Sequence, residues 1–463
     1  MDSLQAKPKR NPFLTGNYAP VKEEVTIEKL RVVGRLPKDL QGMFVRNGPN
    51  PQHPPKGRYH WFDGDGMLHG LRLLNGQASY RNRYVRTEGW QEEKKAGKSL
   101  FNGMLGMPDL RKLFQGREAF KNVANTALVW HDGKLLALWE GGAPHEIKVP
   151  DLDTVGRCTF KKQLKHAFTA HPKVDPQTGE MMFFGYQPVK PYLRYSVLNA
   201  KGQLTHTTPI GLPRPVMMHD FVITNKHSVF LDLPVVFDMA GAFRGRPPLK
   251  FDPKHNSRIG VLPRHGKGES IKWFNVDPCF VVHTLNAFET GDEVVVHACR
   301  MEDFSLLFLP PEQTKPTSKT LGYLYEWRLN LKSGKVREKP LHDQPEDFPR
   351  INESRIGLNA RFGYTLRLSR DAHFKHDLKT GKIEKHEHGK GRLADEGIFV
   401  ARPESKREDD GWLLTLVYDQ KRGKSELVIV DTRAFDKKPV ARVMLPVRAP
   451  FGFHGLWLDD SNL

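Results

Sequence analysis

Cysteine is scarce in this chain of 463 residues, and long apolar runs are missing. The three cysteines, Cys158, Cys279 and Cys299, are an odd number and form no Cys-x-x-Cys pair. This usage argues against a disulfide framework and favours a reducing compartment. No apolar stretch approaches the roughly 18 residues of a membrane span, and residues 1–10 are polar and basic, without an apolar signal core. We therefore expect a cytoplasmic protein.

Motifs of several common enzyme classes are absent as well. The chain has no Gly-x-Ser-x-Gly elbow, no Walker phosphate-binding loop and no His-Glu-x-x-His. Gly64, Gly66 and Gly70 superficially resemble a dinucleotide fingerprint, but the third glycine is one residue late and no βαβ rhythm surrounds it. These absences argue against a serine hydrolase, a P-loop nucleotidase, a zincin and a nucleotide-dependent dehydrogenase.

The charge is strongly basic, with 72 Lys and Arg against 53 Asp and Glu and a net charge of +19. Such a surplus suits nucleic acid, anionic lipid or a solvated surface. The chain carries no RNA-binding signature, helix-turn-helix pattern or zinc-finger spacing, and its basic residues are spread widely. We expect no nucleic-acid partner.

Short apolar or alternating runs, separated by turn residues, recur along the chain. Lys134–Trp139 follows Asp132-Gly133, and Met181–Tyr186 follows Thr178-Gly179. This texture is typical of an all-β protein. Hydrophobic residues make up 38% of the chain and aromatic residues 10%, which is enough for a large core. Strands of this density over the whole length suit a β-propeller, although no strict blade motif repeats.

Two segments depart from the strand texture. Residues 99–121 mix apolar and basic side chains in the manner of short amphipathic helices, and Leu231–Arg244 is apolar, contains a proline and is too irregular to be a strand throughout. Both are interpreted first as pieces of core or cap. The alternative is a hydrophobic rim on the surface.

Four of the 20 histidines have apolar neighbours, where an imidazole is costly unless it meets a hydrogen bond or a metal. They are His171, His219, His283 and His454. Because they lie far apart in sequence, they could meet only on the axis of a closed fold. Taken singly, each is more typical of a hydrogen-bonded core histidine.

Another four histidines lie among Lys, Glu and Gly and are predicted to be solvated surface residues. They are His373, His376, His386 and His388.

Ordered motifs along nearly the whole chain resemble the carotenoid cleavage oxygenases. They include Gln41-Gly-Met-Phe-Val-Arg-Asn-Gly-Pro-Asn, Phe62-Asp-Gly-Asp-Gly-Met, Leu136-Ala-Leu-Trp-Glu-Gly-Gly, Met217-Met-His-Asp-Phe, Asp347-Phe-Pro-Arg-Ile-Asn and Phe451-Gly-Phe-His-Gly. The resemblance implies one domain over residues 1–463, a seven-bladed β-propeller. Residues 1–25 would form an N-terminal arm, and residues 99–121 a short helical cap over the metal-bearing axis that contacts the membrane.

The resemblance also implies iron(II) on the axis, held by His171, His219, His283 and His454. Three glutamates are expected to anchor the second ring nitrogens of these ligands, which fixes tautomer and direction and balances the metal's charge. They map onto Glu140, Glu396 and Glu426; without the resemblance, Glu426 is equally well a strand residue facing water. Thr126 matches a position that crowds one open coordination site and so gates the oxygen position.

Four imidazole ligands leave an octahedral iron two positions, enough to bind dioxygen beside a polyene. The reaction needs no external electrons if both oxygen atoms end in the two carbonyl products. No side chain need act as general acid or base, because the apolar tunnel positions one double bond.

The expected activity is therefore dioxygenase cleavage of a carotenoid or apocarotenoid, at the 9,10 and 9′,10′ bonds. One alternative is central cleavage of an apocarotenal to give retinal. A stilbene-cleaving dioxygenase is another; such enzymes resemble this chain but hold the phenol with a lysine where this chain has Trp139, a residue suited to an apolar tunnel. An isomerohydrolase and a non-catalytic propeller that serves as a binding scaffold complete the alternatives. We expect a monomer that contacts the membrane peripherally.

Overall fold

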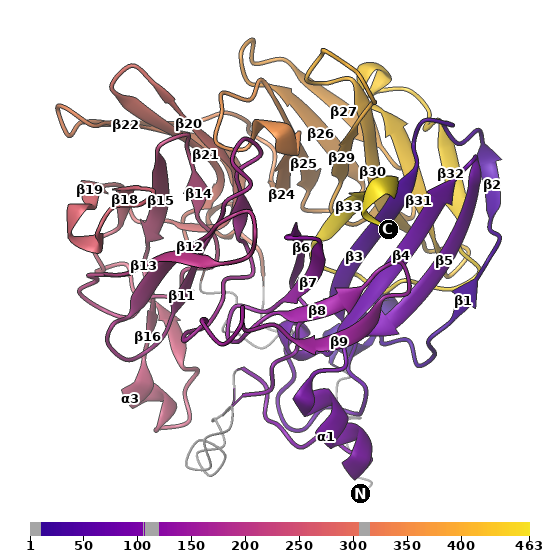
Figure 1. Cartoon of the computed structure of the whole chain (residues 1–463), viewed down its shortest axis with the longest axis horizontal. Helices are drawn as coiled ribbons and strands as arrows, with labels where there is room; N and C mark the ends of the chain where they lie inside the picture. Colours follow the sequence, from indigo (N-terminus) through magenta and orange to yellow (C-terminus); the bar gives the residue numbers. More distant parts are fainter. Residues whose placement is uncertain (1–10, 105, 107–119, 305–314) are drawn as a thin grey trace, which may run out of the picture.

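Seven antiparallel sheets of four or more strands surround a central axis in the computed structural model, which describes residues 11–104, 106, 120–304 and 315–463 (Figure 1). Within these residues an eighth sheet is a two-stranded hairpin of β16 (Val235–Phe237) and β17 (Leu249–Phe251). The predicted all-β, seven-bladed propeller is confirmed.

The blades are numbered in chain order, and each is described from the strand nearest the axis outward. Blade 1 is β33 (Gly455–Asp459), β3 (Gly42–Pro49), β4 (Gly66–Leu74), β5 (Gln77–Tyr84) and β1 (Thr26–Ile27); blade 2 is β6 (Ala127–His131), β7 (Lys134–Leu138), β8 (His145–Lys148) and β9 (Asp153–Arg157); blade 3 is β10 (Lys173–Val174), β11 (Met181–Tyr186), β12 (Leu193–Leu198) and β13 (Leu204–Ile210). Blade 4 is β14 (Val222–Ile223), β15 (His227–Asp232), β18 (Arg258–Pro263) and β19 (Lys272–Asn275); blade 5 is β20 (Phe280–Thr290), β21 (Glu293–Met301), β22 (Tyr323–Asn330) and β23 (Val336–Pro340). Blade 6 is β24 (Glu346–Ile351), β25 (Phe362–Arg367), β26 (Ala372–Asp377) and β27 (Ile383–Glu387); blade 7 is β29 (Ile398–Ala401) and β28 (Arg392–Ala394), both paired with β30 (Gly411–Asp419), then β31 (Lys424–Asp431), β32 (Ala441–Met444) and β2 (Arg31–Gly34).

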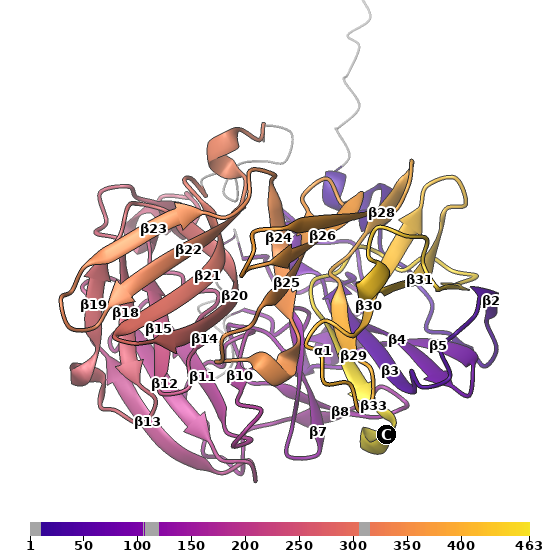
Figure 2. The same ribbon diagram turned by 90° about the horizontal axis from the view of Figure 1, so that it is seen from above.

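The two ends of the chain close the ring together. In blade 1, β33 pairs antiparallel with β3, with Gly42 opposite Asp459 and Arg46 opposite Gly455. In blade 7, β2 pairs with β32. The innermost strands contact one another around the axis, β14 with β20, β20 with β24, β24 with β29, β29 with β33 and β33 with β6. Of these strands, β14, β20 and β24 lie next to one another in Figure 2. Loops beside these strands therefore meet at the centre.

The core lies between the blades, so that a central strand is covered on both faces. Val261 of blade 4 and Trp327 of blade 5 belong to one apolar cluster, and Leu71 of blade 1 and Ile429 of blade 7 belong to another. All residues of β3 and of β26 are buried. A strand in this position cannot expose either of its faces to water.

This packing overturns the prediction that four histidines are solvated, because His373, His376, His386 and His388 are all buried, with at most 7% exposure. Two of them lie on β26 and a third on β27. Each has a polar partner: a ring nitrogen of His376 lies 3.0 Å from Glu346, one of His373 lies 2.8 Å from His388, and Nδ1 of His386 lies 3.0 Å from the Phe435 carbonyl. Their charged sequence neighbours indicated solvent, but the neighbouring blades cover the strand.

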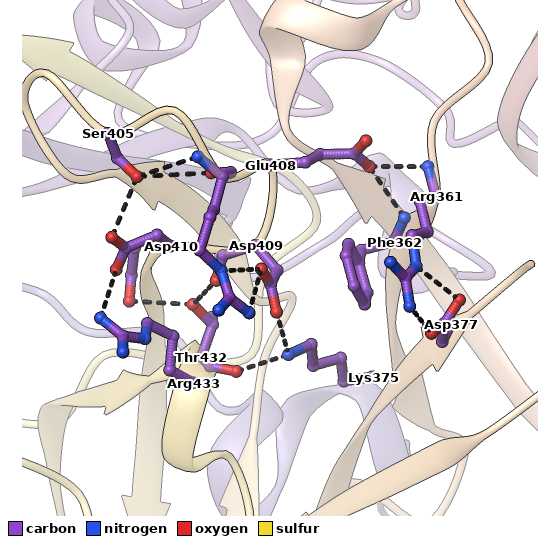
Figure 3. Close-up of polar contacts among 12 residues, drawn as sticks. Arg361, Phe362, Lys375, Asp377, Ser405, Glu408, Asp409, Asp410, Thr432 and Arg433 are labelled. Carbon is purple, nitrogen blue, oxygen red and sulfur yellow. Dashed lines mark hydrogen bonds and ion pairs between the residues drawn. The ribbon is translucent and has the colours of Figure 1, made fainter. Parts of the chain in front are cut away.

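Lys375 on β26 shows how a buried charge is accommodated between blades 6 and 7 (Figure 3). Its ammonium donates to Asp409 at 2.9 Å and to the Thr432 carbonyl at 2.6 Å. Beside it, Glu408 accepts the backbone N–H groups of Arg361 and Phe362. The ion pair and these hydrogen bonds join the two blades where apolar packing is interrupted.

Two short α-helices are described, α1 (Glu88–Ala96) and α3 (Met239–Ala242). The Thr87 hydroxyl caps α1 by accepting from Trp90 N at 3.2 Å, and Gly97 ends it in a left-handed conformation with φ of 65°. The segment predicted as a helical cap, residues 99–121, follows α1; its residues 99–104 form no helix, and Leu105 and residues 107–119 lie outside the described part of the chain. The apolar segment Leu231–Arg244 begins in β15, contributes β16 to the core and then forms α3.

Short 3-10 helices occur in the connections, at Pro12–Leu14, Gly16–Tyr18, Trp61–Asp63, Gly268–Ser270, Ser318–Thr320, Glu353–Arg355, Thr432–Ala434 and Asp460–Asn462. Among the helices of the described residues, none is both long and apolar enough to cross a membrane.

Candidate metal centre

The structure brings the four apolar-flanked histidines together on the propeller axis. His171, His219 and His454 lie just before the innermost strands β10, β14 and β33, and His283 lies within β20. Their candidate ligand atoms all lie within 4.8 Å of one another, and the Nε2 atoms of His171 and His219 are 3.0 Å apart. Four ring nitrogens that converge in this way match the donor set of a metal centre.

Three of the four imidazoles are oriented by carboxylates. Nδ1 of His219 lies 2.7 Å from Glu140, Nδ1 of His283 lies 2.9 Å from Asp347, and Nδ1 of His454 lies 2.9 Å from Glu396. A proton on Nδ1 leaves the lone pair on Nε2, which points to the centre.

The seven groups come from seven different blades. The histidines belong to blades 3, 4, 5 and 1, and the carboxylates Glu140, Asp347 and Glu396 to blades 2, 6 and 7. Tyr186 supports this shell by donating its hydroxyl to Glu140 at 2.7 Å, and the Gly455 N–H donates to Glu396 at 2.8 Å.

Glu426 does not belong to this shell, so its predicted role is wrong. It lies on β31, which pairs with β30 on one side and β32 on the other and is therefore too far from the axis. Its fully buried carboxylate pairs instead with three arginines, Arg392, Arg422 at 3.3 Å and Arg442 at 2.7 Å.

Asp347 takes the place that was assigned to Glu426. Its motif, Asp347-Phe-Pro-Arg-Ile-Asn, was recognised in the sequence. Asp347 was not predicted as a histidine partner, because all three partners were expected to be glutamates. The register of β24 against β25 shifts between Asp347 and Arg350, and Phe348 has a positive φ of 53°. Such irregularities are common beside functional sites, where they redirect a side chain. Pro349 was the signal in the sequence that the strand is irregular here.

Burial and charge affect the imidazoles differently. Burial lowers the pKa of His454 to about 4, although Glu396 opposes this shift. Burial and the neighbouring histidines lower the pKa of His171 well below its usual value. Burial opposes protonation of His219 too, yet Glu140 raises its pKa. Neutral His171 and His454 can offer lone pairs to a metal at pH 7.

A cavity of about 840 Å³ opens beside the centre. His219, His283 and His454 form part of its wall, and Trp139 and Thr126 line it too. Most of the remaining wall is aromatic or aliphatic, with Phe62, Tyr186, Phe237, Phe348 and Phe453 among its residues. The site is therefore a nitrogen-lined centre at the wall of a largely apolar cavity, which suits a hydrocarbon substrate.

A family model described as retinal pigment epithelial membrane protein (RPE65) matches residues 18–459. The chain belongs to the RPE65 and carotenoid cleavage oxygenase family. It is 40% identical to carotenoid 9,10(9′,10′)-cleavage dioxygenase 1 of Arabidopsis thaliana over 97% of this chain and 90% of that protein.

Solved structures of family members share the fold. A lignostilbene dioxygenase of Pseudomonas brassicacearum superposes with a TM-score of 0.89 and 31% identity, covering 97% of this chain and 99% of that one. A Glu150Asp mutant of the Synechocystis apocarotenoid oxygenase superposes with a TM-score of 0.86 and 28% identity, covering 96% and 98%.

Thr126 of this carotenoid oxygenase is fixed beside the centre. Its carbonyl accepts the His454 N–H at 3.2 Å, and its hydroxyl donates to Asn125 at 2.9 Å. Trp139 directly precedes Glu140, and its ring packs so closely on Gly141 that a Cβ there would come within 2.4 Å. Both residues predicted from the sequence thus line the cavity.

A second group of potential ligands, His342, Glu346 and His376, lies in blade 6. Glu346 accepts from His342 at 3.1 Å and lies 3.0 Å from a ring nitrogen of His376, and Thr365 also donates to it. These hydrogen bonds already satisfy the carboxylate and engage both rings, so the group needs no ion.

Proposed function

We propose that this protein is an iron(II)-dependent dioxygenase that cleaves a carotenoid at its 9,10 and 9′,10′ double bonds. The observation that carries the proposal is the convergence of four imidazoles, three of them held by carboxylates, at the wall of a largely apolar cavity. The 40% identity to a 9,10(9′,10′)-cleavage dioxygenase over nearly the whole chain supports it.

His171, His219, His283 and His454 would hold the metal. Imidazole donors suit iron, zinc and copper alike, so the donor set fits iron without selecting it. When bound, iron would supply the activation of dioxygen that lets both oxygen atoms enter the two carbonyl products. The carboxylates Glu140, Asp347 and Glu396 keep the ring directions fixed and compensate the positive charge.

The cavity supplies position rather than acid–base chemistry. Its aromatic wall, including Phe62, Trp139 and Phe453, offers flat apolar surfaces to a conjugated polyene and keeps bulk water away. One double bond is thereby held beside the histidine cluster, and such positioning lowers the entropic part of the barrier. Thr126 narrows the space next to His454 and leaves dioxygen a restricted approach.

The bond that is cut depends on how far the polyene enters. Neighbouring double bonds are only ~2.5 Å apart, less than the ~3.8 Å between adjacent Cα atoms, so one side chain at the end of the cavity can move the cut. We assign the 9,10 bonds on the relationship to the plant dioxygenase. Trp139, in place of the phenol-binding lysine, favours polyenes over stilbenes.

The test is product chromatography with iron-loaded protein. β-Carotene is expected to give ionone and a short central dialdehyde, at about one iron per chain. His→Ala at 171, 219, 283 or 454 should abolish turnover while folding is retained. Retinal as the main product, cleavage of a lignostilbene alone, or full activity of metal-free protein would each contradict the assignment.

We also propose that the protein is a cytoplasmic monomer that contacts the membrane peripherally; the membrane contact is expected because its proposed substrates dissolve in bilayers. Met239 and Phe243, on and just after α3, line the cavity and are 37% and 68% exposed. The basic Arg246 and Lys250 lie close by. Exposed apolar side chains with a basic rim suit an anionic lipid surface.

Liposome flotation tests this contact. Met239→Ser with Phe243→Ser should weaken salt-sensitive binding to anionic vesicles. The matched control is Val33→Ser with Leu74→Ser, at two apolar residues on β2 and β4 that are each 38% exposed. Strand β2 and helix α3 lie on opposite sides of the molecule (Figure 1). Equal flotation of the two double variants would argue against the α3 region.

A further inference from the structure

One stretch of the cavity wall is polar, although most of the cavity is apolar. Tyr59, Asp63, Asp65, Glu93 and Lys121 all contribute to it. Three of them, Tyr59, Asp65 and Glu93, are buried, with exposures of 8%, 3% and 3%. Polar groups in such surroundings require partners, and the partners differ from residue to residue.

Lys121 and two of the acids satisfy one another. The Lys121 ammonium donates to Glu93 at 2.5 Å and pairs with Asp65. Glu93 also accepts the backbone N–H of Leu100 at 2.7 Å, and Asp65 accepts that of Gln52 at 3.0 Å. This triad carries one positive and two negative charges. Its members bond to one another and to backbone N–H groups, so we assign it a structural role.

The Tyr59 hydroxyl differs from this triad. Among the described residues no hydrogen-bond partner of its Oη is found, although the residue is only 8% exposed and lines the cavity. The oxygen itself is not enclosed by protein atoms, so it is open to the cavity that the residue lines. Gly64 leaves room for this hydroxyl, because a Cβ there would come within 2.8 Å of Oη. Burial, and then the charges of Asp63 and Asp65, raise the pKa of Tyr59 well above its usual value, so the group stays protonated.

Asp63 adds an acceptor near this hydroxyl. One carboxylate oxygen accepts the His60 N–H at 2.9 Å and the other the Met104 N–H at 2.7 Å. Each oxygen retains a second lone pair. Burial raises the pKa of Asp63 to about 6, so its carboxylate is mostly ionised at pH 7.

We propose that Tyr59 and Asp63 recognise a hydroxyl group at the end of the polyene, which makes ring-hydroxylated carotenoids the preferred substrate class. An alcohol both donates and accepts a hydrogen bond, and Tyr59 and Asp63 offer the complementary pair. A carbonyl could use only the Tyr59 O–H, and a hydrocarbon ring could use neither group. The inference rests on the proposed function, since it names a substrate class for the same cavity.

The polar stretch and the metal centre belong to one wall. His454 N–H donates to the Thr126 carbonyl, and the neighbouring Asn125 donates to the carbonyls of Phe62 at 2.8 Å and Gly64 at 2.7 Å. Gly64 lies against Tyr59 Oη and next in sequence to Asp63. A polyene with a double bond beside the histidines can therefore direct its ring toward this stretch.

The experiment compares zeaxanthin, which has a hydroxyl on each ring, with β-carotene, which has none, in the same detergent. Tyr59→Phe removes only the hydroxyl. It should lower kcat/KM for zeaxanthin by about 3- to 10-fold, mainly through KM, as loss of one hydrogen bond does, and leave β-carotene unchanged. Tyr195→Phe is the control, because Tyr195 is a buried tyrosine outside the cavity wall whose hydroxyl accepts from Ser228 at 2.8 Å.

Dissociation constants from quenching of tryptophan fluorescence give a second readout that needs no turnover. If Tyr59→Phe weakens the binding of zeaxanthin but not that of β-carotene, the hydroxyl site is supported, whether or not the wild-type protein cleaves either carotenoid. Failure of the wild-type protein to cleave either carotenoid would refute the proposed function, not the hydroxyl site. Unchanged zeaxanthin parameters, or equal losses for both carotenoids, would overturn the inference. A loss confined to β-apo-8′-carotenal would replace the alcohol site by a carbonyl site.

Discussion

Three imidazoles of the candidate metal centre are each paired with a carboxylate from another blade, and this pairing orients their ring nitrogens. Glu140, Asp347 and Glu396 each accept from Nδ1, so that Nε2 keeps its lone pair. Within the described residues His171 has no carboxylate on Nδ1, and its backbone N–H bonds to the Thr169 hydroxyl at 3.0 Å. The candidate centre therefore combines three imidazoles oriented by carboxylates with a fourth, His171, that has no such partner among the described residues.

Amide substitutions should distinguish the buried acids that orient histidines from the buried acid that pairs with arginines. We expect Glu140→Gln, Asp347→Asn and Glu396→Gln to weaken metal affinity or activity by roughly 10- to 100-fold, as loss of a ligand's partner does. Iron content and turnover measure this effect.

Glu426→Gln is the matched comparison, because Glu426 is buried but contacts only arginines. It should retain iron and turnover but lose about 3 kcal/mol of unfolding free energy, because three arginines lose their common partner. Loss of iron in Glu426→Gln at unchanged stability would contradict the assignment of Asp347 to the centre.

At this scale the sequence predicted the side chains with distinctive surroundings. The apolar flanks and motifs of the four histidines, and the motifs around Glu140 and Glu396, placed them correctly beside one another. The prediction that Glu426 anchors a histidine was wrong, because the local sequence around a glutamate in an apolar strand is the same whether that strand lies near the axis or far from it. The position of a strand within its blade is set by tertiary packing, which the local pattern does not contain.

At the scale of the element, most blades place their functional residue on or beside the strand nearest the axis; blade 2 differs, because Glu140 follows its second strand, β7. Charged pairs on strands farther out join neighbouring blades. β26 is the example, since it carries Lys375 between blades 6 and 7. Burial raises the pKa of the Asp409 carboxyl, but the Lys375 contact outweighs this and leaves the pKa below its usual value. The charged pair is thus part of the interface.

Lys375→Met should destabilise the protein by about 3 kcal/mol, because it leaves the Asp409 charge buried without its main partner (Figure 3). Removing both charges, with Lys375→Met and Asp409→Leu, should restore part of the loss. Urea unfolding measures both, and turnover at low temperature should be unchanged because the pair lies outside the site. A double variant whose loss equals the sum of the single losses would contradict the coupling.

Among the elements, the sequence predicted strands well and helices poorly. Asp-Gly and Thr-Gly turns marked β7 and β11, because such turns need residues that tolerate positive φ; Gly133 and Gly179 have φ of 68° and 70°. Helix α1 was missed, although Thr87 and Gly97 are typical cap residues, because its nine residues contain little apolar periodicity. The histidines of β26 and β27 were misassigned because burial came from neighbouring blades.

At the scale of the whole molecule, ring closure brings distant segments into contact and buries many ionised acids. Arg46 on β3 pairs with Asp395 in blade 7 at 3.5 Å, and its guanidinium donates to the Pro450 carbonyl at 2.5 Å. Contacts of this kind require the first and last parts of the chain to be assembled together. Stability should therefore depend on buried ionised groups as well as on apolar area.

Acid should unfold the protein between about pH 4.5 and pH 2. Burial alone would raise the pKa of Glu346, but hydrogen bonds from His342 and His376 lower it to about 2. Glu326 reaches about 2 in the same way, through His297 and Arg328. A folded-state pKa below the unfolded value of 4.5 gives stability that is complete above pH 4.5 and is lost as the pH falls toward 2.

Glu346 should account for about 3 kcal/mol of that loss, and Glu326 for less, because solvent screens its interactions with His297 and Arg328. The pKa of Asp63 is raised to about 6 in the folded protein. This group therefore adds stability as the pH falls from about 6 to about 4, which makes the loss of stability less steep at the upper end of the pH range. Thermal unfolding of wild type and Glu326→Gln across this range measures the effect. The variant should be less stable at pH 7, and the difference should shrink as the pH falls from 4.5 to 2, because the wild-type carboxylate is then neutral as well. Two parallel curves would show that the ion pair of Glu326 contributes nothing to acid lability.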